Sequence, residues 1–209
     1  SLAASERTTD GFKVTWAEPE FNGGEQINDF VVEVSTDNGV TWRSAKASVS
    51  TSLSYRVGGA APGTTYLVRV AAINKIGTGE FVTTSITTLA TVAKAPTNLT
   101  VTNIGLRSLS LGWSLPSSNG GSPIVDYKIE FSSNGGTTWN ELAHDASPSR
   151  SFKVTGLLRG KNYLFRVAAI NEVGVGASSV SVSATTLIEL ASAPQSLTST
   201  STSNAAQFS

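Results

Sequence analysis

The sequence has no cysteine, no methionine, a single histidine and few charged residues. The lack of cysteine excludes disulfide bridges and thiolate metal sites. Charged residues make up 14% of the chain and sum to a net charge of zero, whereas about 25% is typical. No basic or acidic run is present that would attract nucleic acid or an anionic membrane. No apolar run approaches the roughly 18 residues of a membrane span, and no signal peptide is present. We therefore expect neither a nucleic-acid partner nor membrane insertion in this segment.

What the sequence does contain is a repeat. Residues in the second half match those in the first at an offset of 97 positions, without a gap from Leu2/Leu99 to Gly79/Gly176. A period near 100 residues is the size of an independent domain and too long for a solenoid unit. Matched residues include Trp16 and Trp113, Trp42 and Trp139, Tyr66 and Tyr163, and the runs 69–74 and 166–171. A third copy begins at Pro194, so we expect the chain to be an excerpt of a longer protein.

Within each copy, apolar and polar residues alternate in short runs, as in half-buried antiparallel strands. Clusters of Gly, Pro, Asn and Asp separate these runs, and no stretch has a helical period. We predict an all-β chain of two tandem immunoglobulin-like β-sandwiches with about seven strands each. The strands expected in the second copy are 97–103, 107–114, 124–132, 137–143, 151–155, 162–171 and 178–186. The first copy is expected to repeat these ranges minus 97, with a shortened opening strand.

The predicted domains are a sandwich at 1–89, a linker at 90–96, a second sandwich at 97–187, and a linker with the start of a third copy at 188–209. Both linkers end in Ala-Pro. Because proline fixes φ and the first linker has no glycine, we expect a short, semi-rigid connection.

These residues resemble the fibronectin type III family over essentially the whole chain. The resemblance rests on the second-strand Trp, on the Tyr after a corner, and on the strand that ends in Ala-Ala-Ile-Asn and is followed by Gly-x-Gly. The Asn-Gly-Gly loop and the Gly-x-Thr-Trp hairpin are similar to bacterial members found in exported multidomain proteins. Trp16 and Trp113 lie on the inward face of an alternating strand, so we predict that they are buried between the two sheets. The resemblance implies that the hydroxyls of Tyr66 and Tyr163 donate hydrogen bonds to backbone at the corner.

Two motifs could carry chemistry but have simpler structural explanations. Residues 35–42 fit the Asp-box pattern of sialidases, yet the same residues make a β-hairpin turn centred on Asp37. Glu33 and Arg69, repeated as Glu130 and Arg166, are expected to form cross-strand ion pairs on an outward sheet face.

The remaining candidates also favour a structural role. His144 has no counterpart in the first copy and no partner ligands, so we expect a surface-loop histidine. Glu18 and Glu20 are not repeated, so no carboxylate pair for glycoside hydrolysis is found. Trp42 and Trp139 could stack on sugars, but packing over their own sheet is the commoner use. We therefore predict no catalytic, cofactor-binding or metal site, no cofactor and no enzyme activity.

The expected function is a structural spacer or adhesion stalk in a larger exported, extracellular or cell-surface protein. The expected partners are neighbouring domains of the same chain, with a protein or polysaccharide at the cell surface as a further partner, and the segment itself is expected to be monomeric. The alternative is a pair of accessory modules in a secreted polysaccharide-degrading enzyme, where they would assist substrate binding.

Overall fold

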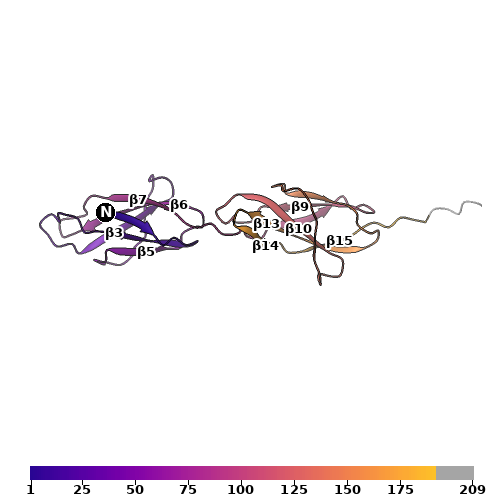
Figure 1. Cartoon of the computed structure of the whole chain (residues 1–209), viewed down its shortest axis with the longest axis horizontal. Coiled ribbons are helices and arrows are strands. Elements are labelled where there is room, and N and C mark those ends of the chain that lie inside the picture. The colour runs from indigo at the N-terminus through magenta and orange to yellow at the C-terminus, as the bar shows by residue number, and fades with distance from the viewer. Residues whose placement is uncertain (192–209) are drawn as a thin grey trace, which may run out of the picture.

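The structure is a computed structural model that describes residues 1–191. Figure 1 shows two β-sandwiches arranged end to end and joined by a single linker segment. All regular elements among these residues are strands, as the period-two alternation predicts. The predicted start of a third copy, from Pro194, lies outside the described residues, and the predicted domain boundaries remain predictions.

The first sandwich consists of two antiparallel sheets. One sheet has the order β1-β2-β5 and the other the order β4-β3-β6-β7. The strands are β1 (Leu2–Ser5), β2 (Gly11–Trp16), β3 (Asp29–Ser35), β4 (Arg43–Ser44), β5 (Ser54–Gly58), β6 (Thr65–Ile73) and β7 (Val82–Thr87).

The second sandwich repeats this arrangement with one added strand segment. Its sheets have the orders β12-β9-β8 and β11-β10-β13-β14, and β15 also pairs with β13. The strands are β8 (Thr97–Thr102), β9 (Leu109–Ser114), β10 (Ile124–Ser132), β11 (Asn140–Glu141), β12 (Ser151–Val154), β13 (Asn162–Asn171), β14 (Gly174–Ser178) and β15 (Val182–Thr185).

Three predicted strands differ clearly from the observed ones, and the first is 40–46 of the first copy, which pairs only at Arg43–Ser44. The strand expected at 137–143 pairs only at Asn140–Glu141, because side-chain hydrogen bonds hold the residues before it in a turn. The strand expected at 178–186 is divided into β14 and β15. Ser179 interrupts the ladder between them, since its Oγ accepts a hydrogen bond from the N–H of Val167 at 3.1 Å.

Each core lies between the two sheets and is centred on the tryptophan of the second strand. Trp113 is 6% exposed, and its ring centroid lies 5.1 Å from that of Tyr127. Trp16 is 9% exposed and packs on Phe30. The predicted burial of both tryptophans is confirmed.

The corner tyrosines are also where the sequence places them, but the hydrogen bond runs the other way. The N–H of Ala61 donates to the hydroxyl of Tyr66 (2.8 Å), and the N–H of Leu158 donates to that of Tyr163 (3.0 Å). The expectation that the hydroxyls donate was wrong. Each corner directs a backbone N–H toward the tyrosine hydroxyl, and the phenol oxygen accepts its hydrogen bond.

Candidate functional site at the junction between the two sandwiches

The described part of the chain holds no group of three or more His, Asp or Glu side chains that could bind a metal ion. None of its elements is a helix long and apolar enough to cross a membrane.

Asp37 organises a hairpin turn, as predicted. Its carboxylate accepts hydrogen bonds from the Ser35 hydroxyl (2.6 Å) and from the Thr41 N–H (2.9 Å). These bonds, with that of the Thr41 hydroxyl, lower the pKa of Asp37 to about 2. In the second copy Asn134 takes this place and bonds the N–H of Thr138 at 3.0 Å. The hydrogen bonds of Asp37 and Asn134 are thus made within their own turns, and the motif has a structural role.

The predicted cross-strand ion pairs form, but the expected solvated face does not hold for the second pair, because Glu130 is buried at 8% exposure. Arg69 Nε donates to Glu33 at 2.7 Å, and Arg166 Nε donates to Glu130 at 2.6 Å. The hydrogen bond from Arg166 lowers the pKa of Glu130, and this effect outweighs the opposing effect of burial.

The two guanidinium groups also cover the tryptophans that could have bound sugars. Arg69 lies 4.3 Å above the Trp42 ring and Arg166 lies 4.2 Å above the Trp139 ring. A cation over the ring face is a stable arrangement of its own. A sugar would therefore have to displace an ion-paired arginine from that face.

His144 does not lie freely on the surface, in contrast to our expectation. Its side chain is 16% exposed, and Nε2 lies 2.9 Å from the carbonyl oxygen of Tyr127. Its Nδ1 lies 3.8 Å from Asp126. In the first sandwich Lys46 forms an ion pair with Asp29, which is the counterpart of Asp126. Lys46 and His144 thus connect the segment after β4 or β11 to the same place on the neighbouring strand, β3 or β10, from positions one residue apart in the repeat.

The junction itself is built from linker residues that lie on the second sandwich. The N–H of Thr91 donates to the carbonyl of Gly120 (2.8 Å), and the N–H of Lys94 donates to that of Ser118 (2.9 Å). The Asn171 side-chain amide donates to the carbonyl of Thr91 (2.8 Å). Three hydrogen bonds thus hold the linker against the loops at one end of the sandwich.

Between these bonds, the linker contributes a side chain to the core. Ala93 is 2% exposed and belongs to the hydrophobic cluster of the second sandwich. Its carbonyl oxygen lies so close to Gly176 that a Cβ added there would overlap it. The linker is therefore packed into the second sandwich as part of its structure.

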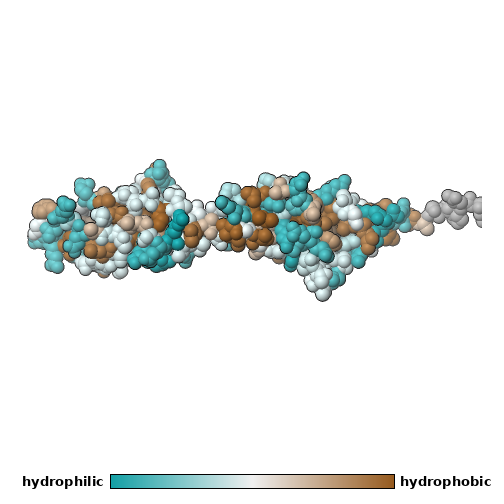
Figure 2. Space-filling view, in the orientation of Figure 1, coloured by the Kyte–Doolittle hydropathy of each residue, from teal (hydrophilic) through white to brown (hydrophobic). Residues whose placement is uncertain are grey.

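A direct backbone contact completes the junction. A Cβ added at Gly63, in the corner of the first sandwich, would overlap the main chain of Gly121 in the second. In the other direction, a Cβ on Gly121 would overlap the carbonyl of Pro62. Figure 2 shows the resulting narrow neck between the two bodies. This contact limits how far the two sandwiches can bend toward that side.

The comparisons with known proteins agree with this architecture. The profile of the fibronectin type III domain matches residues 1–88 and 94–185. The chain belongs to the fibronectin type III family. Its all-β fold of two tandem sandwiches, as predicted, is confirmed.

Similar proteins contain these domains as small parts of long chains. Drosophila melanogaster titin is 32% identical over 82% of this chain, which spans 1% of titin. The striated-muscle M-protein of Gallus gallus is 30% identical over 81% of this chain, which spans 12% of that protein. A crystal structure of the chicken CNTN1 FN1–FN3 domains has a TM-score of 0.66 at 20% identity, covering 90% of this chain and 65% of that one. The tandem fibronectin type III pair is a structural module of the kind found in larger multidomain proteins.

Sequence reasoning identified the motifs of the junction but not their role. Asn171 ends the Ala-Ala-Ile-Asn motif, and Gly120 and Gly121 belong to the Asn-Gly-Gly motif. Their repetition in both copies was the available signal. No sequence pattern indicates that Ala93 is buried, because a single alanine in a linker does not differ from its exposed neighbours in any recognisable way.

Proposed function

We propose that residues 1–191 act as a non-catalytic spacer that holds the domains on either side at a fixed distance and orientation. The observation that carries this proposal is the linker: Thr91 and Lys94 are hydrogen-bonded to the second sandwich, and Ala93 is in its core. A linker that is packed in this way cannot act as a flexible tether. The module therefore fixes the position of the domain at one end relative to the domain at the other end.

The proposed setting is a larger exported or cell-surface protein, with the neighbouring domains of the same chain as partners and the module itself monomeric. It is supported by the Asn-Gly-Gly loop and the Gly-x-Thr-Trp hairpin, which resemble those of bacterial exported proteins. The animal relatives support the family and not this setting. Protease treatment of intact source cells checks it: cleavage of the parent protein is expected, and full protection until the cells are lysed would contradict it.

An accessory role in a polysaccharide-degrading enzyme is less well supported by the geometry. Such modules need an open aromatic face for sugar rings, whereas Arg69 and Arg166 cover Trp42 and Trp139. Titration with soluble polysaccharides, followed by tryptophan fluorescence, is expected to show no saturable change.

Small-angle scattering tests the spacer mechanism directly. The native chain is expected to give an elongated two-body profile. A variant with a flexible Gly-Ser insertion between Ala90 and Thr91 keeps the docked residues 91–94 but separates the corner from the second sandwich. This variant is expected to give a broader distribution of distances. Identical profiles for the two proteins would contradict a rigid junction.

A further inference from the structure

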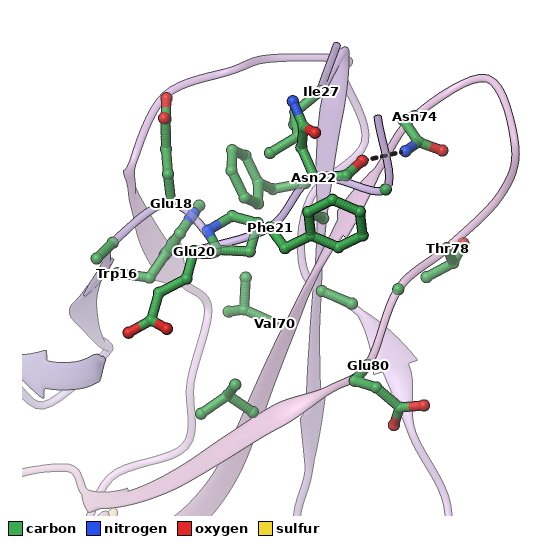
Figure 3. A pocket seen from close by; sticks show the side chains of 18 of the residues that line it. Trp16, Glu18, Glu20, Phe21, Asn22, Ile27, Val70, Asn74, Thr78 and Glu80 are labelled. Atoms are coloured by element: carbon green, nitrogen blue, oxygen red, sulfur yellow. Dashed lines mark hydrogen bonds between the residues drawn. The ribbon is translucent and has the colours of Figure 1, made fainter. Parts of the chain in front are cut away.

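The first sandwich has an open groove at the end that is remote from the junction. It encloses about 650 Å³ between the residue 18–23 loop, the residue 74–80 loop and the inner edge of the core at Trp16. Figure 3 shows the side chain of Phe21 projecting beside the opening, and Phe21 is 80% exposed. The groove therefore extends from the exposed loops to the core tryptophan.

The second sandwich contains the same groove, and there it is occupied. With the offset of 97, the residue 18–23 loop corresponds to residues 115–120 and the 74–80 loop to residues 171–177. These are the loops that hold the linker through Gly120, Asn171 and Gly176. Ala93 fills the apolar centre and is 2% exposed. The chain itself therefore shows what such a groove accommodates.

The polar groups that hold the linker are also present in the first sandwich. Asn171 donates from its amide to Asn119 O and to Thr91 O, both at 2.8 Å. Asn74 makes the first of these bonds, to Asn22 O at 2.8 Å (Figure 3), and has no second acceptor within residues 1–191. One N–H of the Asn74 amide is thus available to a carbonyl placed in the groove.

Gly79 provides an independent argument. Its counterpart Gly176 must lack a side chain because the Ala93 carbonyl lies against it. Gly79 has no positive φ, and a Cβ added there would meet nothing closer than 3.5 Å. Nothing among the described contacts of Gly79 requires a glycine. A linker carbonyl in the groove would require one.

We propose that this groove is a docking site for an extended linker strand of the Thr91–Thr97 type, joined ahead of Ser1 and supplied by a neighbouring module. Its central residue is small, as Ala93 is, and its backbone accepts the free N–H of Asn74. The rim also selects a cationic segment, because Glu18, Glu20 and Glu80 line it and none pairs with a cation within residues 1–191. The counterparts in the second groove are the uncharged Leu115, Ser117 and Ala177.

The test is a graft of Thr-Val-Ala-Lys-Ala-Pro-Thr, the sequence of residues 91–97, directly before Ser1 of the full chain. Thermal unfolding is followed by NMR signals assigned to the first sandwich. The graft is expected to raise the midpoint of that sandwich by about 4 °C or more and to protect the Asn74 side-chain amide from exchange. The matched control carries glutamate in place of the alanine that corresponds to Ala93, and no rise is expected because a charged group cannot enter the core.

Gly79→Ala is a second, independent test of whether a linker carbonyl lies against this residue. In the native chain this substitution is expected to leave the midpoint unchanged or slightly raised, because nothing crowds the site. In the grafted chain it is expected to cancel the gain, because the new Cβ overlaps the docked carbonyl.

The proposal is overturned if the graft gives no rise, or if Gly79→Ala has the same effect with and without the graft. Concentration-dependent association of the native chain that the graft abolishes would also overturn it, since the occupant would then be the linker of another copy. Because the readout is the stability of the first sandwich alone, a failure here is distinct from a failure of the spacer mechanism, which is read from scattering.

Discussion

The N–H of Leu158 donates a hydrogen bond to the hydroxyl of Tyr163 across a corner of the second sandwich, at 3.0 Å. The ring of Tyr163 is buried, with 4% exposure, so water cannot easily replace the phenol oxygen. Tyr163→Phe would leave a backbone donor unpaired in the corner. We expect the free energy of unfolding of this sandwich to fall by about 1–3 kcal/mol. Urea denaturation measures this, and a loss well below that range would show that the corner satisfies its N–H in another way.

Tyr127 gives the opposite expectation for the same substitution. It is 1% exposed, and its hydroxyl has no hydrogen-bond partner among the described residues. Its counterpart in the first sandwich is Phe30, which packs on Trp16 as Tyr127 packs on Trp113. Tyr127→Phe removes an unsatisfied polar group without changing the ring, so we expect the stability to stay unchanged or to rise. A clear loss in the same urea experiment would mean that the hydroxyl has a partner.

Trp113→Ala tests the centre of the core. The side chain is 6% exposed and packs between the two sheets. Truncating a buried tryptophan costs about 3–5 kcal/mol through lost burial and the cavity left behind. A sandwich of this size is only marginally stable, so we expect the second sandwich to lose a large part of its stability and to unfold at a much lower temperature, while the first keeps its own midpoint. Circular dichroism combined with NMR signals from each sandwich distinguishes this from a global loss of structure.

Features set by periodicity and by local motifs could be predicted from the sequence. Period-two alternation gave the strands and their inward faces, and the repeated Tyr66 and Tyr163 gave the corners. Features that depend on two distant segments meeting could not be predicted. Ala93 is buried only because a groove exists in the second sandwich. Lys46 and His144 are equivalent in space but not in register, so a comparison of the two copies by sequence missed the pair.

Asp37 makes the turn of the first sandwich sensitive to acid, whereas Asn134 leaves the turn of the second insensitive. The hydrogen bonds from Ser35 and Thr41 lower the pKa of Asp37 from 3.8 to about 2. A lowered pKa in the folded state means that the carboxylate stabilises the turn above pH 3.8, and that this contribution is lost as the pH falls to about 2. We expect the ¹³C signal of the Asp37 carboxyl to titrate with a midpoint near pH 2. The backbone amides of the 35–42 turn should lose their protection from exchange between about pH 3.8 and pH 2. Asp37→Asn is the matched control and should retain that protection; a midpoint close to 3.8 would contradict the geometry.

The junction is tested by a pair of substitutions at matched positions of the repeat. Asn171 and Asn74 both accept loop N–H groups through Oδ1 and donate to a loop carbonyl through Nδ2. Only Asn171 also donates to the linker, at Thr91 O. Aspartate retains the acceptor and replaces the donor with an oxygen that repels both carbonyls. Asn171→Asp should therefore release the linker, whereas Asn74→Asp should weaken only its own loop.

The measurement is a pulsed-EPR distance distribution between spin labels on the two sandwiches. Because the chain has no cysteine, labels can be attached at single introduced sites, Thr9→Cys and Glu172→Cys, both at exposed residues. In the native background we expect one narrow distribution, since the linker is hydrogen-bonded and Gly63 contacts Gly121. Asn74→Asp should leave this distribution unchanged, and Asn171→Asp should broaden it. If the two variants behave alike, the side-chain amide of Asn171 does not hold the linker, and the rigidity of the junction must come from the packing of Ala93 and the contact between Gly63 and Gly121 alone.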